Sequence, residues 1–136
     1  MTFRLAALSE GNSPLYWDDI QTILGEADVP IIPDAAYQPY TEVITLGNGQ
    51  KRGMGLPSAT WLLSLTPTQK YILRQFCLLT SAAVYIETTT NNFDVSGNQE
   101  WIQASAIMEW QEGEENIDAD ITLDLTIRFS HLVEVT

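Results

Sequence analysis

The chain has 136 residues, which suits one domain of ordinary size, and 45% of them are hydrophobic, which excludes the composition of a disordered protein. Its 18 acidic residues against six basic ones give a formal net charge of −12, so a broad basic surface for nucleic acid is excluded. The single cysteine excludes an intrachain disulfide.

The apolar stretches of the chain are short. None approaches the roughly 18 residues that a membrane span requires. The apolar run near the N-terminus stops at Ser9-Glu10, too early for a secretory signal with its cleavage site. We therefore expect a soluble protein, made in the cytoplasm and not associated with a membrane.

The charge is distributed unevenly along the chain. Residues 94–136 hold ten acids and one base, whereas residues 1–93 hold eight acids and five bases. Two small basic islands, Lys51-Arg52 and Lys70/Arg74, lie in the first part. Separated positive and negative surfaces would allow a subunit to stack on copies of itself, and a simply solvated acidic surface is the alternative.

Residues 1–40 are interpreted as an N-terminal arm, separate from a β-rich domain at residues 41–136. Ser13-Pro14 predicts a helix start, because a capping hydroxyl precedes a proline whose missing N–H is harmless there. Gly25 is a suitable helix end. Between them, three apolar residues fall on one helical face: Trp17, Ile20 and Leu24. Two prolines then impose extended backbone on residues 29–34, which we expect to lie across the domain or on a neighbouring copy.

The first half of the β-rich domain predicts two strands around a glycine-rich loop. Residues 41–46 and 58–65 have strand composition, and four glycines lie in residues 47–55. Asn48-Gly49 is a strong turn signal, because both residues tolerate positive φ. The loop lacks the Gly-Lys-Ser/Thr spacing of a phosphate loop. It is read either as a plain hairpin tip or as a flexible segment that orders against a neighbouring subunit.

One amphipathic helix is expected at Pro67–Leu79. Thr66 and Gln69 have the spacing of a capping box, with Pro67 at the first helical position. Ile72, Phe76 and Leu79 share a face that would pack on a sheet, with Leu73 and Cys77 beside them.

Three further strands are expected at Ala83–Thr90, Trp101–Trp110 and Ile121–Ser130, with a turn at Asn91-Asn92 and an acidic loop at Gln111–Asp120. The last two segments alternate apolar and polar residues, which is typical of half-buried strands. The expected fold class is α+β: a mostly antiparallel β-sheet or sandwich with one packed amphipathic helix and an N-terminal arm.

The block from Thr41 to Val135 resembles the minor tail proteins of long-tailed bacteriophages, of the lambda tail-tip type, in the order and spacing of its motifs. These are a Gly-x-Gly after an apolar residue, a tryptophan strand, a Leu-Thr-x-x-Gln helix with a Phe, a strand ending in tryptophan, and a final alternating strand. The matching residues are Leu46-Gly47-Asn48-Gly49-Gln50, Gly53, Trp61, Leu65-Thr66-Pro67-Thr68-Gln69, Phe76, Tyr85-Ile86, Trp110 and Ile121–Phe129. Gln50 stands where the family has an aromatic residue.

This resemblance implies a structural virion protein, assembled in the host cytoplasm, that forms a ring at the tail-tube end, tail tip or tail junction. Its partners would be copies of itself and other tail proteins, with DNA at most passing through a lumen. A capsid decoration or head–tail connector protein is the alternative within virions. A small carbohydrate- or protein-binding module is the alternative from another class, suggested by four tryptophans.

No enzyme activity, metal or cofactor is predicted. The lone His131 has no accompanying nucleophile motif, and Cys77 is expected to act as a small buried hydrophobe. The acidic loop lacks the calcium-binding EF-hand pattern, so we expect a solvated loop or one that contacts basic residues of a neighbouring subunit. The residues predicted to form the assembly interface are Trp17, Ile31, Ile32, Lys51, Arg52, Met54, Glu112, Glu114, Glu115, Asp118 and Asp120.

Overall fold

The computed structural model describes residues 2–11, 13–25, 32–110 and 123–135. They form an α+β fold in which antiparallel strands predominate, as the sequence predicts. The strands are β1 (Arg4–Ala7), β2 (Asp18–Asp19), β3 (Asp34–Gln38), β4 (Glu42–Thr45), β5 (Lys51–Met54), β6 (Ser58–Leu65), β7 (Ser81–Phe93), β8 (Gln99–Trp110) and β9 (Leu123–Glu134). The α-helices are α1 (Ile20–Leu24) and α2 (Pro67–Arg74), and short 3₁₀ helices lie at Leu8–Glu10 and Pro14–Tyr16.

Seven strands form one sheet in the order β2-β1-β7-β8-β9-β6-β3, and β4 and β5 form a separate two-stranded sheet. The large sheet is strongly curled. β7 and β3 are four strand spacings apart in this order, about 19 Å in a flat sheet. Yet the Asn91 side chain of β7 donates a hydrogen bond of 2.6 Å to the Tyr37 carbonyl of β3. The sheet therefore folds back on itself and encloses the core.

The core lies inside this curl. Trp61 of β6 is fully buried, and its indole N–H donates a 2.9 Å hydrogen bond to the Thr88 hydroxyl of β7. The Trp61 ring also meets Phe3 and Phe129 edge-on, at centroid distances of 5.6 and 4.7 Å. Because one indole contacts segments from three parts of the chain, it ties the two sides of the curled sheet together.

Alternation explains the long strands. In β9, Leu125, Ile127 and Phe129 are buried while Thr126 and Arg128 are exposed, as expected for a strand with one face in the core. β6 has the predicted bounds, and β8 and β9 extend beyond them. β7 also runs on to Phe93, so the turn expected at Asn91-Asn92 is wrong. The pairing with β8 shifts register between Thr89 and Phe93, and this irregularity absorbs the two asparagines.

The helix α2 begins as predicted. The Thr66 hydroxyl accepts from the Gln69 backbone N–H, and the Gln69 side chain accepts from the Thr66 N–H, which completes the capping box. It ends at Arg74, five residues earlier than expected. The guanidinium of Arg74 donates to the carbonyls of Leu78 and Leu79 and lies over the Trp110 ring. The chain turns there, which places Cys77 in the core and leaves Leu79 exposed.

The expected separation of residues 1–40 as an arm is corrected by the strand pairing. β1 pairs with β7 over Arg4–Ala7, and β3 pairs with β6 over Asp34–Gln38, so both belong to the same sheet as the strands after residue 40. β1 and β3 are short, and the partners that bury them come much later in the chain. The composition of these two short segments therefore does not predict strands.

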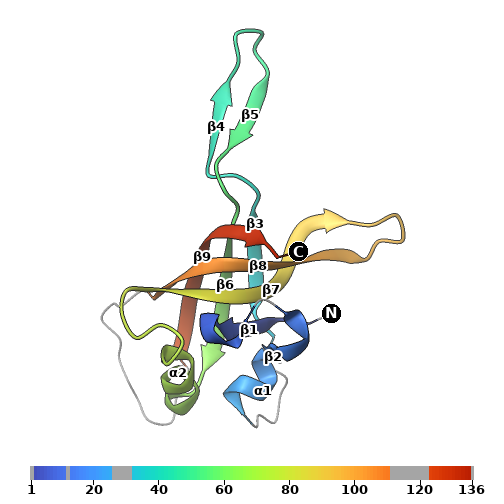
Figure 1. The fold of residues 1–136 in the computed structure, drawn as a ribbon. Helices are drawn as coiled ribbons and strands as arrows, with labels where there is room; N and C mark the ends of the chain where they lie inside the picture. The colour runs from blue at the N-terminus through green and yellow to red at the C-terminus, as the bar shows by residue number, and fades with distance from the viewer. Residues whose placement is uncertain (1, 12, 26–31, 111–122, 136) are drawn as a thin grey trace.

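The helix expected between Ser13 and Gly25 forms only in its last part. Asp19 caps α1, accepting a 2.7 Å hydrogen bond from the Thr22 N–H, and this bond holds the pKa of Asp19 below its ordinary value. Ile20 and Leu24 are buried on one face of α1. In Figure 1, α1 and α2 lie at one end of the curled sheet, and the β4–β5 hairpin projects from the other.

An ion pair joins the buried side chain of Glu87 to Arg4, whose side chain is 30% exposed. Glu87 of β7 is 2% exposed, and its Oε2 lies 3.8 Å from the Arg4 Nε and accepts a 3.1 Å hydrogen bond from Gln103. At 3.8 Å the pair is an ion pair without a hydrogen bond, and the Arg4 Nε has no other partner. By contrast, Arg128 and Glu109 form an ion pair of 3.7 Å at the surface.

We predict that Arg4→Met destabilises the protein by about 3 kcal/mol, because it leaves the Glu87 carboxylate buried and unpaired. Arg128→Met is the matched control and should cost less than about 1 kcal/mol, because its pair is exposed. Urea unfolding followed by tryptophan fluorescence measures both. Equal losses for the two variants would contradict the assignment of Arg4 as the counter-charge.

Candidate interaction surface: the β4–β5 hairpin

The β4–β5 hairpin stands away from the rest of the molecule (Figure 1). Its register joins Glu42 to Met54 and Thr45 to Lys51. The turn closes with a 2.7 Å hydrogen bond from the Leu46 N–H to the Gln50 carbonyl, and Gly49 has φ +85°. The Asn48-Gly49 turn signal is therefore confirmed, because this φ is one that glycine adopts readily.

The hairpin is unusual in how little covers it. Within the described parts of the chain, β4 and β5 pair with each other and with no other strand, so both outer edges keep unpaired backbone groups. Every residue from 41 to 56 is exposed. An isolated two-stranded hairpin is marginal in water, and unpaired strand edges readily pair with another chain. These properties indicate a segment that is completed by a partner.

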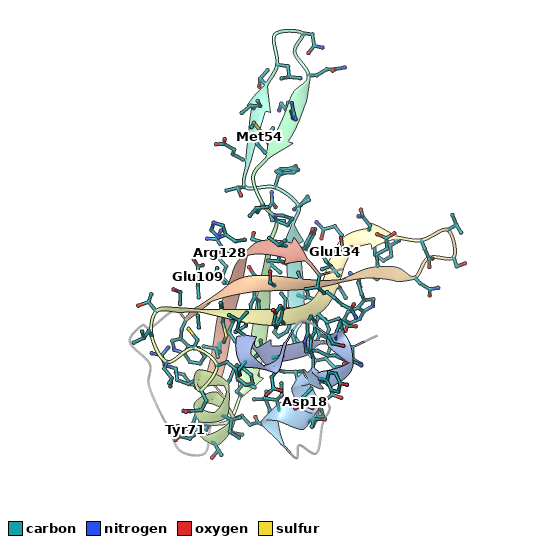
Figure 2. All side chains as sticks on the ribbon, in the orientation of Figure 1. Asp18, Met54, Tyr71, Glu109, Arg128 and Glu134 are labelled. Carbon is teal, nitrogen blue, oxygen red and sulfur yellow. The ribbon has the colours of Figure 1, made fainter. Side chains whose placement is uncertain are left out.

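The apolar side chains of the hairpin support this reading. Five large hydrophobic residues between positions 43 and 56 are 37–48% exposed: Val43, Ile44, Leu46, Met54 and Leu56. Figure 2 shows the labelled Met54 on the projecting hairpin, well beyond the main sheet. Single exposed hydrophobic residues are normal, but a continuous group on a projecting element is typical of an interaction surface.

The two faces of the hairpin differ. By strand alternation and register, Glu42, Ile44, Arg52 and Met54 lie on one face, which we call the pocket face. Val43, Thr45, Lys51 and Gly53 lie on the other. There the Tyr40 ring covers Gly53 so closely that a Cβ at this position would overlap it. Gly53 is therefore required for the close approach of Tyr40.

The base of the hairpin is held by hydrogen bonds. The Thr41 N–H donates to the Met54 carbonyl at 2.7 Å, and the Thr41 hydroxyl donates to the Leu56 carbonyl at 3.0 Å. Beyond them, the Leu132 N–H donates to the Pro57 carbonyl at 3.1 Å, which joins the base to β9. The hairpin is thus anchored where it leaves the sheet, although its strands are uncovered.

A cavity of about 360 Å³ lies between the base of the hairpin and β9. It opens on the pocket face, and its lining is mainly apolar with a few polar groups. The lining residues are Thr41, Glu42, Met54, Gly55, Leu56, Ser58, Arg128, Ser130 and His131. Figure 2 shows Arg128 and Glu109 side by side below the hairpin.

His131 marks an irregularity beside this cavity. Its φ is +55°, a left-handed conformation that is uncommon for residues other than glycine. The pairing of β9 with β8 shifts register between Ser130 and Val133, as in a β-bulge with one extra residue. The periodicity of the sequence does not predict this bulge.

The structure places the predicted interface residues in different environments. Lys51, Arg52 and Met54 are all exposed on the hairpin, and the two basic side chains have no hydrogen bond or ion pair with any described residue. Ile32 is 70% exposed. The remaining residues except Trp17 lie outside the described part of the chain: Ile31, Glu112, Glu114, Glu115, Asp118 and Asp120.

The prediction that Trp17 is an interface residue is corrected. Trp17 is 4% exposed, stacks on Tyr85 with a centroid distance of 5.3 Å, and donates a 3.0 Å hydrogen bond to the Gly11 carbonyl. Burial of its ring against β7 leaves no free face for a partner. Trp61 and Trp110 are also buried, as expected, and Trp101 is half-buried against Phe3. None of the four tryptophans therefore offers an exposed platform for a sugar.

The structure also locates the groups considered for chemistry. Over the described ranges, no three His, Cys, Asp or Glu side chains are grouped so that they could hold a metal ion. The same ranges contain no helix that is long and apolar enough to cross a membrane. Cys77 is fully buried, and burial raises the pKa of its thiol, which Arg74 opposes.

Sequence reasoning missed two features of this surface: the cavity at the hairpin base and the exposure of Ile44 and Leu56. The apolar residues flanking the glycine-rich loop gave a partial signal, because they have strand composition but no obvious later partner. Comparisons with protein-family models, with curated proteins and with solved structures gave no match.

We predict that Cys77 reacts with a thiol reagent such as DTNB at least about 100-fold more slowly in the folded protein than in 6 M urea. Burial hinders access and keeps the thiol protonated at pH 8. The reaction is measured by absorbance, with free cysteine as the control for reagent. Reaction of the folded protein at the rate of the unfolded chain would contradict the burial of Cys77.

Proposed function

We propose that this protein is a structural subunit that assembles with copies of itself through the β4–β5 hairpin. The observation that carries the proposal is the hairpin itself. Among the described residues, neither outer strand edge of the hairpin is paired, its apolar side chains are exposed, and Lys51 and Arg52 have no hydrogen bond or ion pair. An element of this kind gains stability when a second chain covers it. A folded body with a projecting element also suits a repeating assembly.

The resemblance of residues 41–135 to minor tail proteins supports a more specific proposal. On that basis the assembly is a ring in the tail of a bacteriophage, and the protein is part of the virion without catalytic activity. The projecting hairpin is compatible with contact between subunits or between successive rings. A capsid decoration or head–tail connector protein is the runner-up.

Self-assembly is tested with purified protein over a range of concentrations by analytical ultracentrifugation. We predict that Ile44→Thr/Met54→Thr weakens assembly at least about 100-fold, because two side chains at the centre of the interface lose their burial. Threonine keeps the strand propensity of the hairpin. The matched control is Leu78→Thr/Leu79→Thr, which changes two residues that are 63% and 77% exposed in the segment after α2.

The proposal is supported if the control variant assembles at the same concentration as the original protein and the hairpin variant loses assembly. A wild-type protein that stays monomeric at all concentrations contradicts self-assembly. Equal weakening of both variants contradicts the role of the hairpin. The placement in a tail is tested by the neighbouring genes: a long tape-measure gene beside this one supports it, and a major capsid gene favours the runner-up.

A further inference from the structure

A second hairpin projects from the molecule, formed by the ends of β7 and β8 (Figure 1). Phe93 pairs with Gln99, and all residues from 91 to 100 are exposed. We call residues 93–100 the β7–β8 tip. Phe93 is 64% exposed, and Val95 is fully exposed at the turn. Both apolar side chains therefore lie mostly or wholly outside the cover of the described residues, at the end of a projecting loop.

The β7–β8 tip has a defined shape. The Asp94 carboxylate accepts hydrogen bonds of 2.9 Å from the backbone N–H groups of Asn98 and Ser96, and Gly97 has φ +83°. The bond from Asn98, together with that from Ser96, holds the pKa of Asp94 below its ordinary value. Because these bonds order the turn before any partner arrives, docking would cost little conformational entropy.

The charges of the two hairpins are opposite. The β7–β8 tip carries Asp94 and Glu100 and no base. The β4–β5 hairpin carries Lys51 and Arg52 against the single acid Glu42. Arg52 lies on the pocket face of β5, two residues before Met54 in the sequence. Met54 itself lines the cavity. The cavity wall itself holds one base, Arg128, which forms an ion pair with Glu109, and one acid, Glu42.

The apolar features also match. The cavity at the base of the β4–β5 hairpin is open, mainly apolar and about 360 Å³ in volume, which is enough to accept an aromatic side chain. Phe93 is an aromatic side chain without cover at the end of a projecting turn. Aromatic anchors that fill pockets, enclosed by a polar rim, are common centres of protein interfaces.

We propose that the β7–β8 tip of one copy seats in the cavity beneath the β4–β5 hairpin of the next copy, with Phe93 as the anchor. Glu100 then faces Arg52 of the neighbour. The proposal rests on the proposed self-assembly and specifies its contact. Because the tip and the cavity are different surfaces of one molecule, the contact is head-to-tail, and repetition closes a ring or builds a filament.

Charge exchange tests the pairing. Arg52→Glu and Glu100→Arg are each expected to weaken assembly about tenfold or more, and the double variant is expected to recover most of the loss. The matched control combines Arg52→Glu with Glu10→Arg, an exposed acid elsewhere, and should not recover. Failure of the Arg52→Glu/Glu100→Arg double variant to assemble better than either single variant would overturn the contact.

Disulfide capture tests the seat of the tip. Copies with Val95→Cys are mixed with copies carrying Leu56→Cys and oxidised, and we expect cross-linked heterodimers in preference to either homodimer. Thr45→Cys, on the opposite face of the hairpin, is the matched control and should cross-link much less to Val95→Cys. Equal capture at positions 45 and 56 would overturn the proposed seat.

Different results would contradict the proposed function and the proposed contact. A protein that never assembles contradicts both the proposed function and this contact. A protein that assembles through the β4–β5 hairpin, but is unaffected by Phe93→Ser/Val95→Ser, keeps the proposed function and overturns the docking of the β7–β8 tip. Loss of assembly by Phe93→Ser/Val95→Ser, with an unchanged unfolding midpoint in urea, supports the contact.

Discussion

The curl of the seven-stranded sheet is the constraint on which the rest of the structure depends. Strands that are distant in sheet order meet across the core, where the Trp61 indole donates to the Thr88 hydroxyl and Asn91 donates to the Tyr37 carbonyl. Once the sheet curls, the helices cover one end and the β4–β5 hairpin leaves from the other (Figure 1). The buried Trp61–Thr88 bond makes this arrangement specific, because both groups would lose their partner in a flat sheet.

Two hairpins project from this body: the β7–β8 tip extends strands of the large sheet, whereas β4 and β5 form a sheet of their own. Most of β7 and β8 lies within the sheet, but residues 91–100, at the end of β7 and the start of β8, are exposed. All residues of β4 and β5 are exposed. A stable core with exposed, apolar, oppositely charged projections is the arrangement expected of a subunit that completes its structure by assembly. The chain's large negative charge is therefore less informative than the position of its few bases. Two of them, Lys51 and Arg52, lie on one hairpin and have no hydrogen bond or ion pair with another described residue.

The sequence predicted features that depend on neighbouring residues. Alternation located β6, β8 and β9, the Thr66–Gln69 capping box located the start of α2, and Asn48-Gly49 located the hairpin turn. It did not predict features that depend on distant partners. β1 and β3 were interpreted as an arm because their pairing strands lie far along the chain, and Trp17 was taken as exposed because Tyr85 covers it only in the fold. The cavity, likewise, requires β9 and its bulge at His131 beside the hairpin.

The central claim is that the β4–β5 hairpin is completed by another copy. Amide hydrogen exchange of residues 42–54, measured by mass spectrometry in dilute and in assembled protein, tests it most directly. We predict that the amides of residues 42–54 exchange fast at low concentration and at least about tenfold more slowly in the assembly. The amides of the buried strand β6 should change little. Hairpin amides that exchange equally fast in both states would contradict it.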